Sequence, residues 1–249
     1  MAAQNKFKYG LLALLVSAAL TGCGLDGDDG EQGETGAQGE QGEQGESGAD
    51  GTDASLGITL DVVARAYLGN QTAAEIVQYH ADTQTIYATN GDINTIAVIA
   101  AGSDNIPTSA MDDPIGTTNL TVTDITLPEE VDGVTLGSLT SIAISGDLMA
   151  VAVPADTKTD NGYVLFYNGL DSSSPVFLDQ VEVGALPDMV TFTPDGGKVL
   201  VANEGEPSSD YTVDPEGSIS VINILASGEP EESASTISFT DFNDEQETL

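Results

Sequence analysis

The chain has 249 residues and a single cysteine, and 40% of its residues are hydrophobic, which is enough to bury a core. Five Lys and Arg residues stand against 41 Asp and Glu residues, so the net charge is -36. This charge repels phosphate groups and disfavours binding to nucleic acid or to an anionic membrane surface. We therefore expect no nucleic-acid partner, and the lone cysteine leaves no disulfide framework within the chain.

The first 23 residues are predicted to be a lipoprotein signal peptide. Lys6 and Lys8 give a positive start, and residues 11–20 form an apolar run that is too short for a stable membrane span. The sequence Leu-Thr-Gly-Cys at 20–23 has the small-residue pattern that ends in the lipid-accepting cysteine of bacterial lipoproteins. We predict that Cys23 carries a lipid that anchors the protein to the membrane. The alternative is an ordinary cleaved signal peptide in which this cysteine has no such role.

The residue after the cysteine bears on the location. Gly24 follows Cys23 where some lipoproteins have aspartate. By analogy with lipoprotein sorting in Gram-negative bacteria, this favours the outer membrane. We expect a protein of the bacterial cell envelope that is exposed to the periplasm or to the cell surface.

Residues 24–54 are predicted to be a low-complexity tether, because glycine occupies every third position from 24 to 51. Gly-X-Y is the period of collagen, in which only glycine fits at the axis of three wound chains. The run has no proline, and it has no Lys or Arg to pair with its many acidic residues. Two interpretations remain. One is a charged, extended and largely disordered spacer, and the other is a collagen-like stalk that forms a trimer through residues 24–53.

Residues 55–249 are predicted to be an all-β domain, because three segments repeat the order strand, turn, strand, loop, strand. The expected strands are residues 76–79, 85–89 and 95–100, then 140–145, 148–153 and 162–167, then 189–193, 198–202 and 217–224. Pro194-Asp195-Gly196 is a strong hairpin-turn signal in the third copy. Residues 198–202 are apolar without alternation, which predicts a strand covered on both faces. An outer strand is expected at 236–242.

Strand repeats of this length are typical of β-propeller blades, in which each small sheet buries its faces against its neighbours. We therefore predict a partial β-propeller of about three to four blades. A β-sandwich with similar hairpins is the alternative. Three blades and part of a fourth would leave strand edges exposed, so we expect such a product to aggregate or to pair with another copy.

Two segments carry a family resemblance. The sequences AAEIVQYHADTQTIYATNG at 73–91 and LPDMVTFTPDGGKVLVANEGEPSSDYTVDPEGSISVI at 186–222 resemble the choice-of-anchor I family of bacterial surface and secreted β-propellers, which are relatives of YVTN-type propellers. The resemblance runs from about residue 60 to the end and implies the N-terminal part of a longer propeller.

The loop of residues 203–216, here called the acidic loop, sets five carboxylates between two predicted strands. Calcium takes six to eight oxygen ligands from carboxylates and carbonyls, so such a loop can supply a calcium site. The candidate metal ligands are Glu204, Glu206, Asp210 and Asp214. The alternative is a solvated loop shaped by its prolines and glycines, since the spacing is not that of an EF-hand.

No catalytic residue is predicted. His80, the sole histidine, stands at a strand end beside Asp82, where a structural or surface role is more typical than catalysis. No serine lies in a G-x-S-x-G elbow, and Gly196-Gly197-Lys198 lacks the rest of a phosphate-binding loop.

Two functional classes remain. The first is an envelope-anchored lipoprotein that displays a β-propeller as a binding or scaffold module for an extracellular or envelope ligand. The second, implied by the resemblance, is a calcium-dependent secreted phosphoesterase of the alkaline phosphatase or phytase kind, in which carboxylates would hold the metal. Because no basic clamp for phosphate is visible, we prefer the first class.

Overall fold

The computed structural model describes residues 60–69, 73–240 and 242. In this part of the chain, fourteen strands form four antiparallel sheets and no α-helix is present. The all-β prediction is therefore confirmed. Within the same residues, no helix has both the length and the apolar character needed to cross a membrane. The predicted signal peptide at 1–23, with Cys23, and the tether at 24–54 lie outside the described residues.

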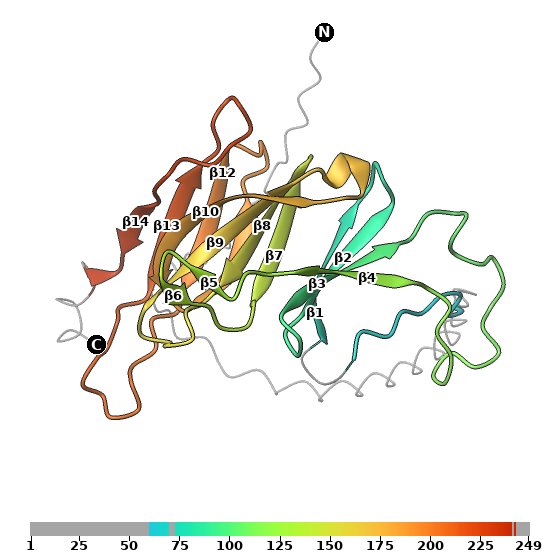
Figure 1. Cartoon of the computed structure of the whole chain (residues 1–249), viewed down its shortest axis with the longest axis horizontal. Helices are drawn as coiled ribbons and strands as arrows, with labels where there is room; N and C mark the ends of the chain where they lie inside the picture. Colours follow the sequence, from blue (N-terminus) through green and yellow to red (C-terminus); the bar gives the residue numbers. More distant parts are fainter. Residues whose placement is uncertain (1–59, 70–72, 241, 243–249) are drawn as a thin grey trace, which may run out of the picture. The chain divides into compact units, whose positions relative to one another are not determined.

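Sheet 1 holds the first four strands in chain order (Figure 1). They are β1 Ala73–His80, β2 Thr85–Asn90, β3 Thr95–Ala100 and β4 Val122–Thr126. The turns before β2 and β3 need Gln84 and Asn94 in the left-handed region, with φ of 51° and 52°. Asparagine tolerates this region better than most residues. The first three strands were predicted, whereas β4 was not.

A small hairpin leads from sheet 1 to sheet 2. It consists of β5 Glu130–Val131 and β6 Val134–Thr135, joined by Asp132-Gly133 with φ of 51° and 84°. Positive φ at both central positions is the mark of a tight hairpin turn that matches the twist of the strands. The Asn94 side chain fixes the next segment, because its Oδ1 accepts a hydrogen bond from Leu139 N (3.0 Å) and its Nδ2 donates to Gly137 O (3.2 Å).

Sheet 2 is formed by the next four long strands, in the order β10-β9-β8-β7. They are β7 Ser141–Ser145, β8 Leu148–Val153, β9 Asn161–Asn168 and β10 Val176–Ala185. A short 3-10 helix, η1 Leu170–Ser172, joins β9 to β10. The strand β10 was not predicted. Its pairing with β9 shifts register twice, and only its second half, residues 181–185, alternates between buried and less buried positions.

Sheet 3 completes the described part of the chain with β11 Pro187–Phe192, β12 Lys198–Asn203, β13 Ser218–Asn223 and β14 Ser235–Ser238. The hairpin turn predicted before β12 is confirmed. Asp195 Oδ1 accepts hydrogen bonds from Thr193 Oγ1 (2.6 Å) and Gly197 N (3.0 Å), and these bonds lower the pKa of its carboxyl group. The outer strand expected at 236–242 is present as β14, but its predicted C-terminal boundary is wrong, because β14 ends at Ser238.

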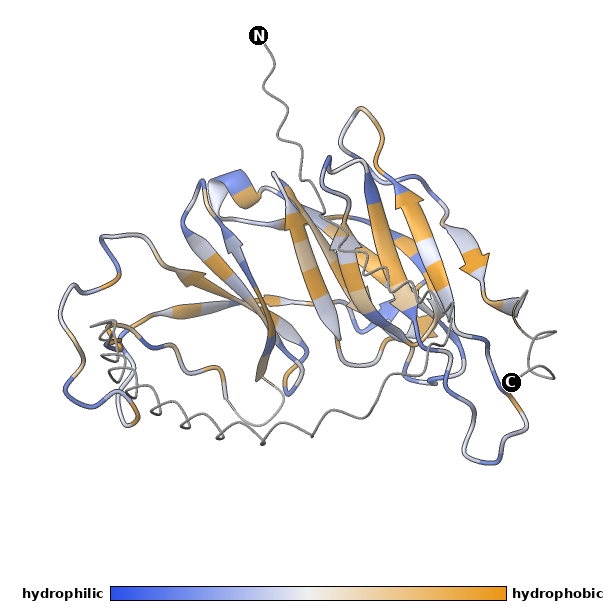
Figure 2. Cartoon of the chain, turned by 180° about the vertical axis from the view of Figure 1, so that it is seen from behind, coloured by the Kyte–Doolittle hydropathy of each residue, from blue (hydrophilic) through white to orange (hydrophobic). Residues whose placement is uncertain are grey.

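Sheet 2 is buried on both faces. Alternate residues of β8 point to opposite sides, so Met149 and Val151 pack with Tyr87 of sheet 1, while Ala150 packs with Val201 of sheet 3. The strand β9 divides in the same way between the two clusters. Figure 2 shows hydrophobic residues as orange bands across the strands. The sheets therefore pack in series, with sheet 2 between the other two, which differs from the two facing sheets of a sandwich.

The prediction that residues 198–202 are covered on both faces is wrong for this strand, β12, whereas β8 and β9 are buried on both faces. In β12 the side chains of Val199 and Val201 are buried against sheet 2, whereas Leu200 and Ala202 are only half-buried. The reason is the position of the strand, because the described residues place an interface on only one side of sheet 3.

Candidate functional site

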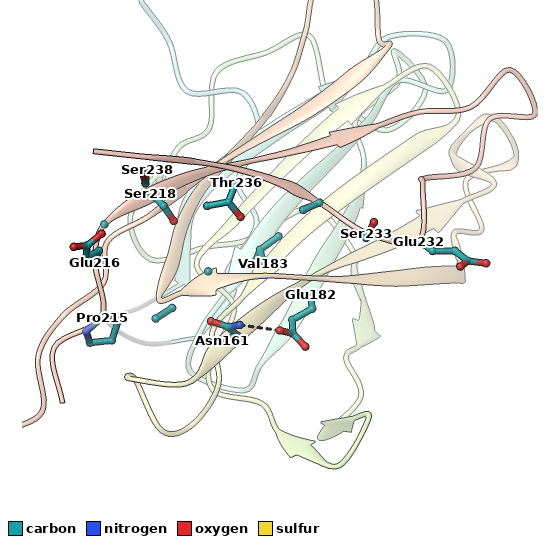
Figure 3. A pocket seen from close by; sticks show the side chains of 14 residues that line it. Asn161, Glu182, Val183, Pro215, Glu216, Ser218, Glu232, Ser233, Thr236 and Ser238 are labelled. Atoms are coloured by element: carbon teal, nitrogen blue, oxygen red, sulfur yellow. Dashed lines mark hydrogen bonds between the residues drawn. The ribbon is translucent and has the colours of Figure 1, made fainter. Parts of the chain in front are cut away.

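A cavity of about 570 Å³ lies between β10 of sheet 2 and the strands β13 and β14 of sheet 3 (Figure 3). We call it the hydroxyl pocket because of its lining. Its polar side chains come from both walls and from the end of the acidic loop. They are Asn161, Glu182, Glu216, Ser218, Glu232, Ser233, Thr236 and Ser238.

The register of sheet 3 explains the hydroxyl groups. Ser218 of β13 lies opposite Ser238 of β14, and Ser220 lies opposite Thr236. Residues that face each other across paired strands present their side chains on the same face of the sheet. Ser218 and Ser220 are buried, so this is the face that packs toward sheet 2. Sheet 3 therefore presents hydroxyl groups where an ordinary core face would be apolar.

Asn203, the last residue of β12, adds an amide to this wall. Its Nδ2 donates hydrogen bonds to Ser218 Oγ (3.0 Å) and Ser220 Oγ (2.9 Å). Its Oδ1 is buried and has no hydrogen-bond partner among the described residues. Such an unpaired acceptor costs about 1–3 kcal/mol.

A glycine on the opposite wall makes room for this amide. A Cβ at Gly184 would lie 2.8 Å from Nδ2 of Asn203, which is closer than side chains approach each other. Gly184 and Ser218 both line the hydroxyl pocket, so the Asn203 amide lies beside it. The pair of Gly184 and Asn203 thus sets the closest approach of sheets 2 and 3 at this place.

The charge of the hydroxyl pocket is negative. Glu182, Glu216 and Glu232 line it, and no Lys, Arg or His of the described residues does. Glu182 Oε1 accepts a hydrogen bond from Asn161 Nδ2 (2.7 Å), while Figure 3 shows Glu216 and Glu232 near opposite ends of the lining. A pocket with this lining suits ligands that carry hydroxyl or amino groups and repels phosphate.

The acidic loop begins beside the same pocket. Glu204 N donates to Leu186 O (2.9 Å), and Gly205 N donates to Ala185 O (3.2 Å). Gly205 has φ of +66°, and a Cβ there would lie 2.6 Å from the carbonyl oxygen of Pro215. The two ends of the loop are therefore held close together, which positions Glu216 at the edge of the hydroxyl pocket.

The predicted metal ligands of the acidic loop have other contacts. Glu206 forms an exposed ion pair with Lys158 at 2.8 Å. Asp210 Oδ1 accepts hydrogen bonds from Ser208 Oγ (2.8 Å), Thr212 Oγ1 (2.8 Å) and Thr212 N (3.2 Å). These bonds lower the pKa of the Asp210 carboxyl group and close a turn inside the loop.

The four candidates, Glu204, Glu206, Asp210 and Asp214, are not gathered into one ligand group. In the described part of the chain, the three side chains that bring ligand atoms within 4.8 Å of one another are those of His80, Asp82 and Asp171. A calcium site in the acidic loop stays a prediction.

Sequence reasoning missed the hydroxyl groups of β13 and β14 that line the hydroxyl pocket, and it found only the adjacent acidic loop. The signal was present in the β13 segment SISVIN, where serine takes the positions that become buried. The sequence alone does not tell which face of the strand packs on sheet 2, and serines that face solvent would give the same pattern.

The comparison with protein families gives one match. The family model for the choice-of-anchor I domain matches residues 75–249, which is most of the chain. The chain belongs to the choice-of-anchor I family. The resemblance inferred from the segments at 73–91 and 186–222 is therefore confirmed, although the match begins at 75 and not near 60. A search of curated proteins finds no match to this choice-of-anchor I protein. Membership of this family indicates a bacterial protein associated with the cell surface or envelope.

Proposed function

We propose that this protein is an envelope-anchored lipoprotein that displays a β-propeller-type binding module. Three consecutive four-stranded sheets, each with its strands adjacent in chain order, pack face to face in series. This is how blades follow one another in a propeller, and it supports that interpretation of the domain. Residues 24–54 then act as the spacer, either as an extended tether or as a trimeric stalk.

The anchor rests on Cys23, which ends the Leu-Thr-Gly-Cys sequence. We expect Cys23→Ser to abolish labelling of the protein by a radioactive fatty acid and to move it from the membrane fraction to the soluble fraction. Ser17→Ala is the matched control, because it changes a hydroxyl group in the same signal segment without touching the cysteine. Membrane attachment and lipid labelling that persist in Cys23→Ser would rule out this anchor.

The hydroxyl pocket is the proposed binding site, and its lining carries the proposal. A wall of hydroxyl groups and three carboxylates match a ligand that offers hydroxyl and positively charged amino groups. Amino sugars are such ligands, and amines pair with carboxylates through charge-assisted hydrogen bonds. We therefore propose an amine-bearing glycan of the envelope or its surroundings as the ligand class.

Binding of chitosan oligosaccharides by the full-length chain tests this proposal. We expect chitosan to bind about ten-fold more tightly than its N-acetylated counterpart of equal length, which lacks the positive charges. Glu182→Gln should weaken chitosan binding about ten-fold, because hydrogen bonds to charged groups contribute about 1.5–3 kcal/mol. The measurement is isothermal titration calorimetry.

The control is Glu129→Gln, which removes an exposed carboxylate outside the hydroxyl pocket and should leave the affinity unchanged. Equal weakening by both substitutions would mean that chitosan responds only to net charge. That result, or equal affinity for the two oligosaccharides, would refute the pocket as the site.

The phosphoesterase alternative gains no support from the described residues. Their three Lys and Arg side chains are bonded elsewhere. Arg65 donates to the carbonyls of Ile115 and Thr117, Lys158 pairs with Glu206, and Lys198 donates to Asn223. None of the three lines the hydroxyl pocket, where a phosphate group would need them.

A further inference from the structure

A second polar cluster lies where sheet 1 meets sheet 2, away from the hydroxyl pocket. His80 ends β1, Asp82 lies in the turn that follows it, and Asp171 belongs to η1 of sheet 2. One potential ligand atom from each of these three side chains lies within 4.8 Å of the other two. The cluster therefore joins residues from two sheets that are far apart in the sequence.

The imidazole of His80 is buried and held in one orientation. Its exposed fraction is 4%, and its Nδ1 lies 2.8 Å from Thr83 Oγ1. Its other nitrogen, Nε2, lies 3.3 Å from Asp171 Oδ1. A histidine that ligates a metal is oriented in this way, with one ring nitrogen bonded to the protein and the other directed at the site.

A buried tyrosine provides independent evidence that a polar group at this junction lacks a hydrogen-bond partner. Tyr87 is fully buried, and its hydroxyl group has no hydrogen-bond partner among the described residues. Burial first, and then the charge of the Asp147 carboxylate, raise the pKa of this hydroxyl group. Asp147 Oδ1 in turn accepts a hydrogen bond from Asp171 N (2.8 Å).

Among the described residues, the carboxylates at this junction have no basic partner apart from His80. Asp82, Asp147 and Asp171 converge there, whereas Arg65, Lys158 and Lys198 bond to other groups, as described above. A bound cation would balance these carboxylates and use the oriented imidazole nitrogen at the same time.

We propose that His80, Asp82 and Asp171 bind one divalent transition-metal ion, and that zinc fits this donor set best. Zinc takes imidazole nitrogen and carboxylate oxygen in tetrahedral sites, and three protein ligands leave one position for water. Calcium prefers six to eight oxygen ligands and fits less well. Both carboxylates are exposed and can turn toward the ion, which then ties the β1–β2 turn to η1.

Titration of the full-length chain with zinc chloride, after treatment with a chelator, tests this site. We expect one zinc ion per chain and a higher melting temperature, because a ligand that binds only the folded state stabilises it. Asp82→Asn and Asp171→Asn should each weaken zinc binding at least ten-fold. Thr83→Val should weaken it about ten-fold, since residues that orient a ligating histidine have effects of this size.

The exposed aspartates carry the test, because substitution of buried His80 also disturbs packing. Asp188→Asn is the control, since Asp188 is exposed and lies outside the cluster, and its zinc affinity should equal that of the parent. The site is refuted if the parent chain binds no zinc, or if zinc binding survives Asp171→Asn unchanged. Zinc binding lost on Glu204→Gln in place of Asp171→Asn would assign the ion to the acidic loop and equally overturn the proposal.

Discussion

Replacing Phe166 by alanine should lower the free energy of unfolding by about 3–5 kcal/mol, the usual cost of emptying a buried aromatic site. Phe166 is fully buried in the cluster between sheets 2 and 3. Because it lies in β9, near the middle of sheet 2, the walls around it belong to two sheets and cannot both collapse into the space. Denaturant unfolding followed by circular dichroism measures the change.

A matched substitution separates this packing effect from the loss of an aromatic ring in general. Phe239 is 49% exposed, so Phe239→Ala should change the free energy of unfolding by no more than about 0.5 kcal/mol. Similar small effects of Phe166→Ala and Phe239→Ala would show that sheets 2 and 3 do not pack as described.

The same core explains which parts of the fold were predictable from sequence. The apolar runs of β8 and β9 have no alternation because both faces of sheet 2 are covered, and turn residues bound them clearly. The strand β12 has a similar run, yet one of its faces is only half-buried. Local sequence cannot distinguish the two cases, since coverage depends on which sheet comes next.

The missed strands have a related cause. Residues of β4 are largely exposed, with the pattern VTDIT, and they follow a long irregular segment that contains Asp113-Pro114. The strand β10 shifts register twice against β9, and its buried positions alternate only from Val181 to Ala185, while residues 176–180 show no alternation. In both strands the hydrogen bonds to a neighbour, and not the hydrophobic pattern, decide the structure.

The candidate sites were predictable only in part, because both depend on pairs of distant residues. The carboxylates of the acidic loop are adjacent in the sequence and were found, whereas the hydroxyl wall requires the β13–β14 register. His80 was interpreted as a structural or surface residue because it is a lone histidine at a strand end. Its contact with Asp171 arises only when sheet 1 packs on sheet 2. The sequence therefore identified individual residues, whereas the packing of the sheets brings these residues together into candidate sites.

Gly205→Ala should destabilise the domain through two effects that add. The left-handed φ of +66° costs an alanine about 1–2 kcal/mol. The new Cβ would also lie 2.6 Å from the backbone carbonyl of Pro215, and overpacking of this kind costs about 1–3 kcal/mol more. Since the other side of the contact is backbone, relief requires the two ends of the acidic loop to separate. Thermal unfolding measures the loss of stability.

Gly133→Ala isolates the first effect. Gly133 has φ of +84°, but nothing lies within 4 Å of the position that its Cβ would take. The difference in lost stability between Gly205→Ala and Gly133→Ala therefore measures the steric crowding where the two ends of the acidic loop meet. A larger effect for Gly205→Ala should be accompanied by weaker chitosan binding, because separating the loop ends moves Glu216 and Ser218 at the edge of the hydroxyl pocket. Equal destabilisation by the two substitutions would mean that the loop ends are not held together, and the link between loop and pocket would then be lost.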